Sequence, residues 1–147
     1  PGCALYGINP TPGRPNPMER VITLEVPVLQ VREVAAGETV GYGASWRAER
    51  PTRVATSAAG YADGWLRALS GKGFAMAKGV RAPLIGRVSM DLTTFDVTDA
   101  PGLAQGDTLT LLGAEQDADA AATLAGTIGY EMLTSLGSRY ARRHLPA

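Results

Sequence analysis

The sequence predicts a mainly β domain, a small β-barrel or sandwich-like structure with one or two short helices near its C-terminus. Two observations predict this class. Short apolar segments recur along most of the chain, separated by glycine, proline or aspartate, a spacing typical of small barrels and sandwiches. Residues 117–125, which are rich in alanine, and residues 127–135 then change to a composition that favours helix.

The expected strands follow from hydrophobic alternation and from the turn residues between them. In Val21–Val34, the side chains of Leu24 and Val26 share one face with other apolar residues, and Pro27 predicts a sheet edge or a bulge. One helical turn is expected at 65–69. The other expected strands are 39–46, 53–59, 74–77, 81–85, 87–90, 93–97 and 108–112.

The two ends of the chain differ from this β-rich centre. Residues 1–7 form an apolar, strand-like run, and 9–18 hold four prolines and a glycine in ten residues, which predicts an irregular linker. Near the other end, Asp117 or Asp119 is expected to cap a helix. The basic run 136–145 is expected to be a solvated segment rather than a set of anion ligands.

The composition excludes several classes of function. The 147 residues suit one domain, 45% are hydrophobic, and the formal net charge is +0, so no basic surface predicts nucleic-acid binding and no segment predicts a membrane span. One cysteine and one histidine, Cys3 and His144, cannot form a disulfide framework or the usual zinc site, so no metal is expected. The single cysteine fits a reducing compartment, here the cytoplasm.

Three of the five tyrosines directly follow a glycine. They stand in VGYGASW (Tyr42), AGYADGW (Tyr61) and GTIGYEM (Tyr130). A flanking glycine lets backbone or ligand approach the ring and hydroxyl, because it adds no side chain. One such tyrosine favours a structural role, whereas three in a small β domain indicate a binding or catalytic site.

A fourth stretch, GRVSMDL, offers backbone donors. Gly86 permits a bend after a strand, and the N–H groups around Ser89, Met90 and Asp91 could bind a carboxylate, with Asp91 orienting the loop. Taken alone, this stretch is better explained by a core methionine and a turn aspartate.

Together these stretches resemble the C-terminal domain of the alanine racemase family, in which a pyridoxal phosphate (PLP)-binding (β/α)8 barrel precedes a mostly β domain. The order GETVGYGASW, GYADGW, GRVSMD, GDTLTLLG, TIGYE and a closing arginine-rich strand holds throughout the chain. The resemblance implies that 1–14 is the end of the barrel and a linker, and that 15–147 is the C-terminal β domain.

The resemblance also implies roles for individual residues. The family interconverts L- and D-alanine, which supplies D-alanine for peptidoglycan, with one base on each face of a planar intermediate held by PLP. Tyr42 matches the tyrosine base, and Tyr61 a tyrosine at the entrance that restricts access to small substrates. Met90 matches a residue whose N–H contacts the substrate carboxylate, in a loop lined by Ser89 and Asp91.

Three further residues match positions that contact the cofactor. Tyr130 matches a residue that hydrogen-bonds the PLP phosphate, and Gly2 and Cys3 match backbone contacts to the same group. Arg139 and Arg142 match the closing arginine-rich strand, and no catalytic role is assigned to them. In the family's homodimer, Tyr42, Tyr61 and Met90 would enter the partner's barrel, so each site is composite.

The chain departs from the family pattern in its cofactor residues, and the arginine that contacts the pyridine nitrogen in the family is absent from it. It lacks the PLP lysine, because Lys72 and Lys78 flank GFAMA in a glycine-bounded hairpin, a poor place for a covalent cofactor link. The chain alone is therefore expected to be inactive. Two alternatives stay open: the same fold in a serine or broad-specificity racemase, and a non-enzymatic β-barrel module for binding or dimerisation.

Overall fold

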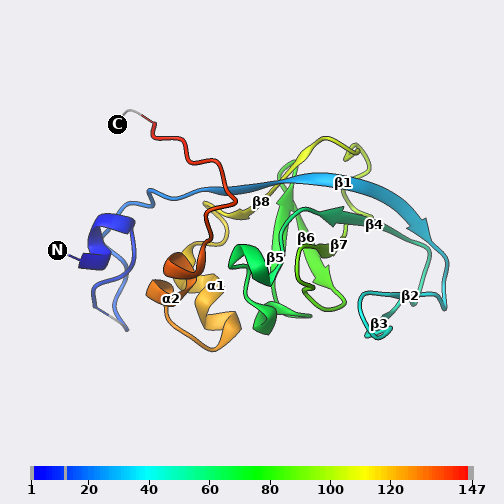
Figure 1. The fold of residues 1–147 in the computed structure, drawn as a ribbon, viewed down its shortest axis with the longest axis horizontal. Coiled ribbons are helices and arrows are strands. Elements are labelled where there is room, and N and C mark those ends of the chain that lie inside the picture. The colour runs from blue at the N-terminus through cyan, green and yellow to red at the C-terminus, as the bar shows by residue number, and fades with distance from the viewer. Residues whose placement is uncertain (1, 12, 146–147) are drawn as a thin grey trace.

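The computed structural model describes residues 2–11 and 13–145, which form a barrel flanked by helices (Figure 1). The barrel strands are β1 (Leu24–Val34), β4 (Thr52–Ser57), β5 (Phe74–Ala77), β6 (Val80–Ile85), β7 (Thr93–Asp96) and β8 (Thr108–Leu112). They close in the order β1-β4-β7-β6-β5-β8, and all their pairings are antiparallel. The mainly β class that the sequence predicts is confirmed, and of its two alternatives the structure shows the barrel.

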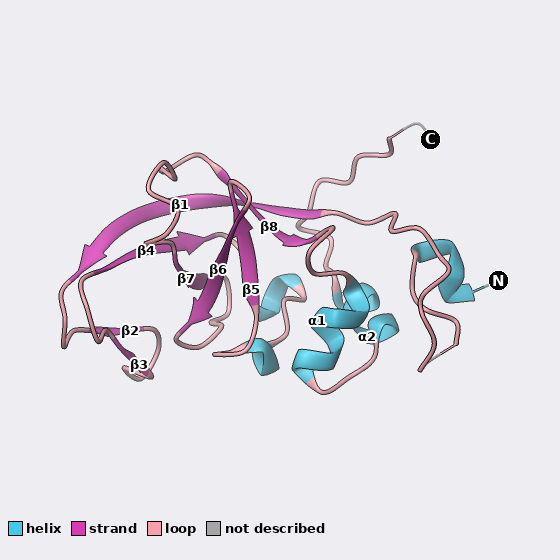
Figure 2. Ribbon diagram, turned by 180° about the vertical axis from the view of Figure 1, so that it is seen from behind, coloured by secondary structure: helices cyan, strands magenta, loops and turns pink. Residues whose placement is uncertain are grey.

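The smaller elements lie outside the barrel wall. They are the two-stranded sheet of β2 (Thr39–Val40) and β3 (Trp46–Arg47), the 3-10 helices η1 (Gly2–Tyr6), η2 (Tyr61–Asp63) and η3 (Arg67–Leu69), and the α-helices α1 (Ala118–Ala125) and α2 (Gly129–Ser135). The helices η1, α1 and α2 lie towards one end of the molecule, and β2 and β3 lie at the other (Figure 2).

Strand β1 closes the barrel because it pairs with two different strands. Residues 24–27 pair with β8 and residues 28–34 pair with β4, with an irregular register in each pairing. Pro27 stands where the strand changes partner, and its carbonyl accepts a hydrogen bond from Ala58 N–H at 3.2 Å. Proline has no N–H to donate, so a change of partner is where it costs least. The register irregularities lie on either side of Pro27, between 24 and 25 and between 28 and 30, so the expected bulge is next to the proline rather than at it, and the alternative of a sheet edge is wrong.

Two apolar clusters stabilise this arrangement. The larger fills the barrel and extends to the helices, and its most deeply buried large side chains include Trp65, Phe95 and Met132. The smaller lies under β2 and β3, where Val40 and Ala48 pack with buried residues of the barrel wall. The short sheet is therefore held in place by side-chain burial as well as by its own hydrogen bonds.

The two aspartates near α1 have different roles. The Asp117 carboxylate accepts a hydrogen bond from Ala120 N–H at 2.8 Å and caps α1, which confirms one of the two expected caps. Asp119 instead accepts a hydrogen bond from Asn9 N–H at 2.8 Å. It therefore ties the proline-rich segment to α1. No helix or strand occurs in the described residues between η1 and β1, as the prolines predict.

Four segments differ from the expected strands. Residues 2–6 are a 3-10 helix rather than a strand, and 39–46 is interrupted by a turn over 41–45. Residues 87–90 are irregular, because Gly86 turns the chain at φ +71° and Ser89 N–H bonds Leu92 O within the loop. The described part of the tail, 136–145, contains no strand and is exposed at 141–145.

The domain boundaries expected at 1–14 and 15–147 stay a prediction, and residues 1, 12, 146 and 147 lie outside the described part. Among the described residues, no helix is long and apolar enough to cross a membrane.

Glycine at position 60 is expected to be essential for stability. A Cβ added there would overlap the main-chain carbonyl of Met90, which cannot rotate away. Gly60→Ala should lower the free energy of unfolding by about 2 kcal/mol. Gly102→Ala is the matched control, because its Cβ would meet no atom within 4 Å. Equal midpoints for the two variants in urea unfolding would contradict the prediction.

Candidate functional site

The loop between β6 and β7, residues 86–92, is the centre of the candidate site. Gly86 begins it and lies against Gly41 in the turn between β2 and β3. A Cβ on Gly41 would stand 3.0 Å from Gly86 Cα and 3.1 Å from Arg87 N, and Gly41 has φ +85°. The turn that carries Tyr42 is thus in backbone contact with the loop that carries Ser89, Met90 and Asp91.

A second segment docks on the other side of this loop. Tyr61 N–H donates to Ser89 O at 3.0 Å, and Ala62 N–H donates to Met90 O at 2.9 Å. Gly60 permits this approach, because any side chain there would overlap the Met90 carbonyl. The GYADG and GRVSMD motifs are therefore joined by backbone hydrogen bonds, a contact that their separation in the sequence did not reveal.

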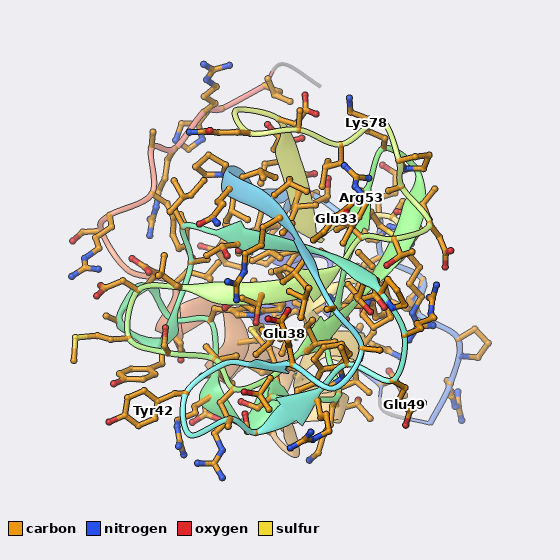
Figure 3. All side chains as sticks on the ribbon, turned by 90° about the vertical axis from the view of Figure 1, so that its right-hand side faces the viewer. Glu33, Glu38, Tyr42, Glu49, Arg53 and Lys78 are labelled. Atoms are coloured by element: carbon orange, nitrogen blue, oxygen red, sulfur yellow. The ribbon has the colours of Figure 1, made fainter. Side chains whose placement is uncertain are left out.

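The side chains that these segments present are exposed. Tyr42, Tyr61 and Met90 are 78%, 44% and 54% exposed, and Tyr42 extends from the molecule at its turn (Figure 3). Several exposed apolar side chains from three adjoining segments mark a surface suited to binding. The structure thus brings together Tyr42, Tyr61 and the 89–91 loop, five of the eight predicted site residues.

Arg139 joins two acidic residues at this site. Its Nη1 lies 2.6 Å from Asp91 Oδ1 and 3.3 Å from Asp63 Oδ1. Asp63 is 5% exposed, and its other carboxylate oxygen accepts Gly60 N–H at 2.9 Å. The hydrogen bond to Asp91, with the charge of Asp63, raises the pKa of the Arg139 guanidinium. Arg139 therefore stays charged and holds two carboxylates that would otherwise repel each other.

Tyr140, next in the chain, lies against the core. Its hydroxyl is buried without a hydrogen-bond partner among the described residues. Burial, reinforced by the nearby charge of Asp63, raises the pKa of Tyr140 to about 12.

The other three predicted residues form a separate group. Cys3 is buried at the start of η1, and Tyr130 in α2 is half exposed. Hydrogen bonding to Cys3 is the main cause that raises the pKa of the Tyr130 phenol, which keeps it protonated as a donor. Gly2 has φ +46° and open space where a Cβ would stand. Gly2 and Cys3 are consecutive residues of η1, and Cys3 lies close to Tyr130, so the three residues are near one another.

The two groups lie at opposite ends of the molecule. Figure 1 shows β2 and β3, which flank Tyr42, at one end and η1 beside α2 at the other. Lys78 belongs to neither group, because its Nζ binds Asp107 at 2.9 Å and the Gly102 carbonyl at 2.7 Å. Within the described ranges, no three His, Cys, Asp or Glu side chains could together hold a metal ion.

Comparison with known proteins decides the family. Residues 21–144 match the sequence model of "Alanine racemase, C-terminal domain". The chain belongs to the alanine racemase family. An alanine racemase of Acidiphilium cryptum is 58% identical over 142 residues, which cover 97% of this chain and 40% of that protein. The chain thus spans about 40% of the length of its curated relatives.

Solved alanine racemase structures share the fold. The Bartonella henselae enzyme with covalently bound pyridoxal phosphate aligns with a TM-score of 0.93 and 42% identity, over 99% of this chain and 41% of that chain. The Bacillus anthracis enzyme with bound L-Ala-P aligns with a TM-score of 0.83 and 33% identity, over 92% of this chain and 36% of that chain.

The alanine racemase resemblance did not reveal how the motifs support one another. Asp63 was visible only as part of GYADGW, and Arg139 only as one of several tail arginines. An aspartate between Gly60 and Gly64 was the only local signal of a tight turn. Its role as a structural anchor follows from its burial, since a carboxylate is buried only with partners. The basic residue that pairs with it is 76 positions away, and local spacing cannot predict such a contact.

Tyr140 should give the protein a specific alkaline sensitivity. Its raised pKa means that the folded state favours the neutral phenol, so this contribution to stability is complete below about pH 10 and is lost as the pH rises towards 12. Urea unfolding across this range should show a smaller loss of stability in Tyr140→Phe than in the wild type. An equal loss in both proteins would contradict the assignment. Tyr6→Phe, at an exposed tyrosine, is the control.

Proposed function

We propose that this chain is the C-terminal part of a PLP-dependent alanine racemase that interconverts L- and D-alanine by a two-base mechanism. The contact of Gly41 with Gly86 carries the proposal, because it fixes the Tyr42 turn against the loop of Ser89, Met90 and Asp91. An exposed phenol and the Met90 N–H thus lie on two segments that are in backbone contact. The reaction would supply D-alanine for peptidoglycan in the cytoplasm.

Tyr42 exchanges the substrate proton. Its phenol oxygen removes the Cα proton of L-alanine and returns a proton to the same face in the reverse direction. Removal of a proton requires the phenolate, and a cationic partner favours that form. The high exposure of Tyr42 in this chain supports a site completed by another domain.

The neighbouring segments bind and select the substrate. No described residue accepts a hydrogen bond from Met90 N–H, so this group is available for the substrate carboxylate. The backbone bonds from Tyr61 and Ala62 fix the carbonyls of Ser89 and Met90, and the loop keeps its shape as a result. Tyr61 stands beside it and limits the size of the side chain that enters.

The second group fits the phosphate of PLP. Tyr130 keeps its phenolic proton and can donate to a phosphate oxygen, and the space beside Gly2 allows an anion to approach the main chain. When bound, PLP supplies an electron sink for the carbanion at Cα. The lysine that would hold PLP covalently belongs to the part of the enzyme that precedes this domain.

A homodimer with composite sites accounts for the separation of the two groups. One small cofactor could not contact both ends of the same chain, since Tyr42 and the Gly2–Cys3–Tyr130 group lie far apart along the molecule (Figure 1). We infer that Tyr42, Tyr61 and Met90 serve the partner's cofactor, while Tyr130 serves its own. The exposed apolar residues around Tyr42 would then be covered in the dimer.

Tyr42→Phe in the full-length enzyme tests the proton-transfer role. Loss of the hydroxyl should reduce racemisation of L-alanine by about 100-fold or more, while PLP absorbance is retained. Tyr6→Phe makes the same chemical change at an exposed tyrosine without an assigned role. Unchanged turnover in Tyr42→Phe would exclude Tyr42 from the mechanism. L-serine, assayed in parallel, distinguishes an alanine-selective enzyme from one of broader specificity.

The 147-residue chain by itself should neither racemise alanine nor bind PLP covalently. Its lysines are Lys72 and Lys78, and Lys78 is already engaged with Asp107. The purified chain is incubated with one equivalent of PLP, reduced with borohydride and analysed by intact-mass measurement and peptide mapping. Neither lysine should carry a stoichiometric label. Stoichiometric labelling, or measurable racemisation, would overturn this expectation.

A further inference from the structure

We propose that Arg139 is a positioning residue for the substrate-carboxylate loop: it couples Asp91 to the buried Asp63 and so fixes the main chain at Met90. This inference rests on the proposed function, because it assigns a purpose to the loop that the proposed reaction uses. Arg139 does not itself touch the substrate.

Asp63 is the fixed end of this coupling. It is 5% exposed, and its Oδ2 accepts Gly60 N–H at 2.9 Å. Its main-chain carbonyl accepts Gly137 N–H at 3.0 Å, so Asp63 is tied both to its own loop and to the tail. Arg139 follows Gly137 closely in the chain, and the same hydrogen bond therefore helps to place its side chain.

Asp91 is the adjustable end. Its side chain is 54% exposed, and Arg139 Nη1 binds its Oδ1 at 2.6 Å, the shorter of the two ion pairs. The other bonds of the loop hold the carbonyls of Ser89, Met90 and Leu92. The Arg139 contact restrains Asp91, the residue that follows Met90, whereas the other bonds restrain the carbonyls. It therefore limits rotation of the main chain that carries the Met90 N–H.

Charge gives a second reason for this arrangement. Without Arg139, the carboxylates of Asp63 and Asp91 would have no ion-pair partner among the described residues, and their repulsion would displace the more exposed Asp91 side chain. Asp91 lies next to the donor that binds the substrate carboxylate. Loss of Arg139 would therefore misplace the donor and also leave an uncompensated negative charge close to an anionic substrate.

The test compares Arg139→Ala, Arg139→Lys and Arg143→Ala in the full-length enzyme. Arg139→Ala should raise KM for alanine about tenfold, with kcat changed less than about threefold, because it weakens carboxylate binding rather than proton transfer. Arg139→Lys should recover most of this loss, since one nitrogen makes both contacts. Arg143 is exposed and has no ion pair among the described residues, so Arg143→Ala should match the wild type.

Hydrogen exchange gives a readout independent of activity. Peptides that cover 86–92 should exchange faster in Arg139→Ala than in Arg143→Ala, with Arg139→Lys between the two. Asp91→Asn leaves the Asp63–Arg139 pair in place. If Arg139→Ala fails to fold, Asp91→Asn must still raise KM and accelerate exchange in this loop.

Three results would refute the positioning role. They are an Arg139→Ala enzyme with wild-type KM and exchange, an Arg139→Lys enzyme as impaired as Arg139→Ala, and equal effects of Arg143→Ala. A wild-type enzyme that does not racemise alanine would instead refute the proposed function. An active wild type with any of the three results would refute the positioning role alone.

Discussion

The candidate site depends on the docking of one main-chain segment directly onto another. Tyr61 and Ala62 donate to the carbonyls of Ser89 and Met90, and this approach is possible only because Gly60 has no side chain. A contact between two backbones fixes position more firmly than one between flexible side chains, because few torsions remain free. The loop that carries Met90 and Asp91 is thus determined by residues that begin nearly thirty positions earlier.

The same device appears at the opposite side of this loop, where Gly41 and Gly86 meet. Both have positive φ, a conformation that costs glycine little. The glycines around Tyr42 were expected to permit a close approach to the tyrosine. The structure shows another backbone in close contact with Gly41 itself rather than with the tyrosine ring, and it shows this segment as a turn rather than a strand. The contact between Gly41 and Gly86 holds the turn in place and leaves Tyr42 exposed. This arrangement suits a side chain that acts on a neighbouring molecule.

Polar contacts between distant segments complete the arrangement. Arg139 connects the tail to Asp63 and Asp91, while Asp119 connects α1 to the segment that follows η1. Each contact unites parts of the chain separated by dozens of residues. The tail that the sequence indicated as solvated is therefore divided, with exposed residues at 141–145 and a structural arginine just before them.

The sequence by itself determined the mainly β class, most of the strands, a cap at Asp117 or Asp119 and the family, because alternation, turn residues and caps are local properties. The choice of a closed barrel over a sandwich, and of Asp117 over Asp119 as the cap, came from the structure. Its motifs also indicated Tyr42, Tyr61, Met90 and Tyr130 as candidates. Only the tertiary structure decided that the Tyr42 segment is a turn, that 87–90 is an irregular loop, and that Gly2–Tyr6 is a 3-10 helix. It also decided that Asp63 and Arg139 support the site. These features depend on which segments meet in space. Nothing in the sequence around Asp63 indicates which arginine will neutralise its carboxylate.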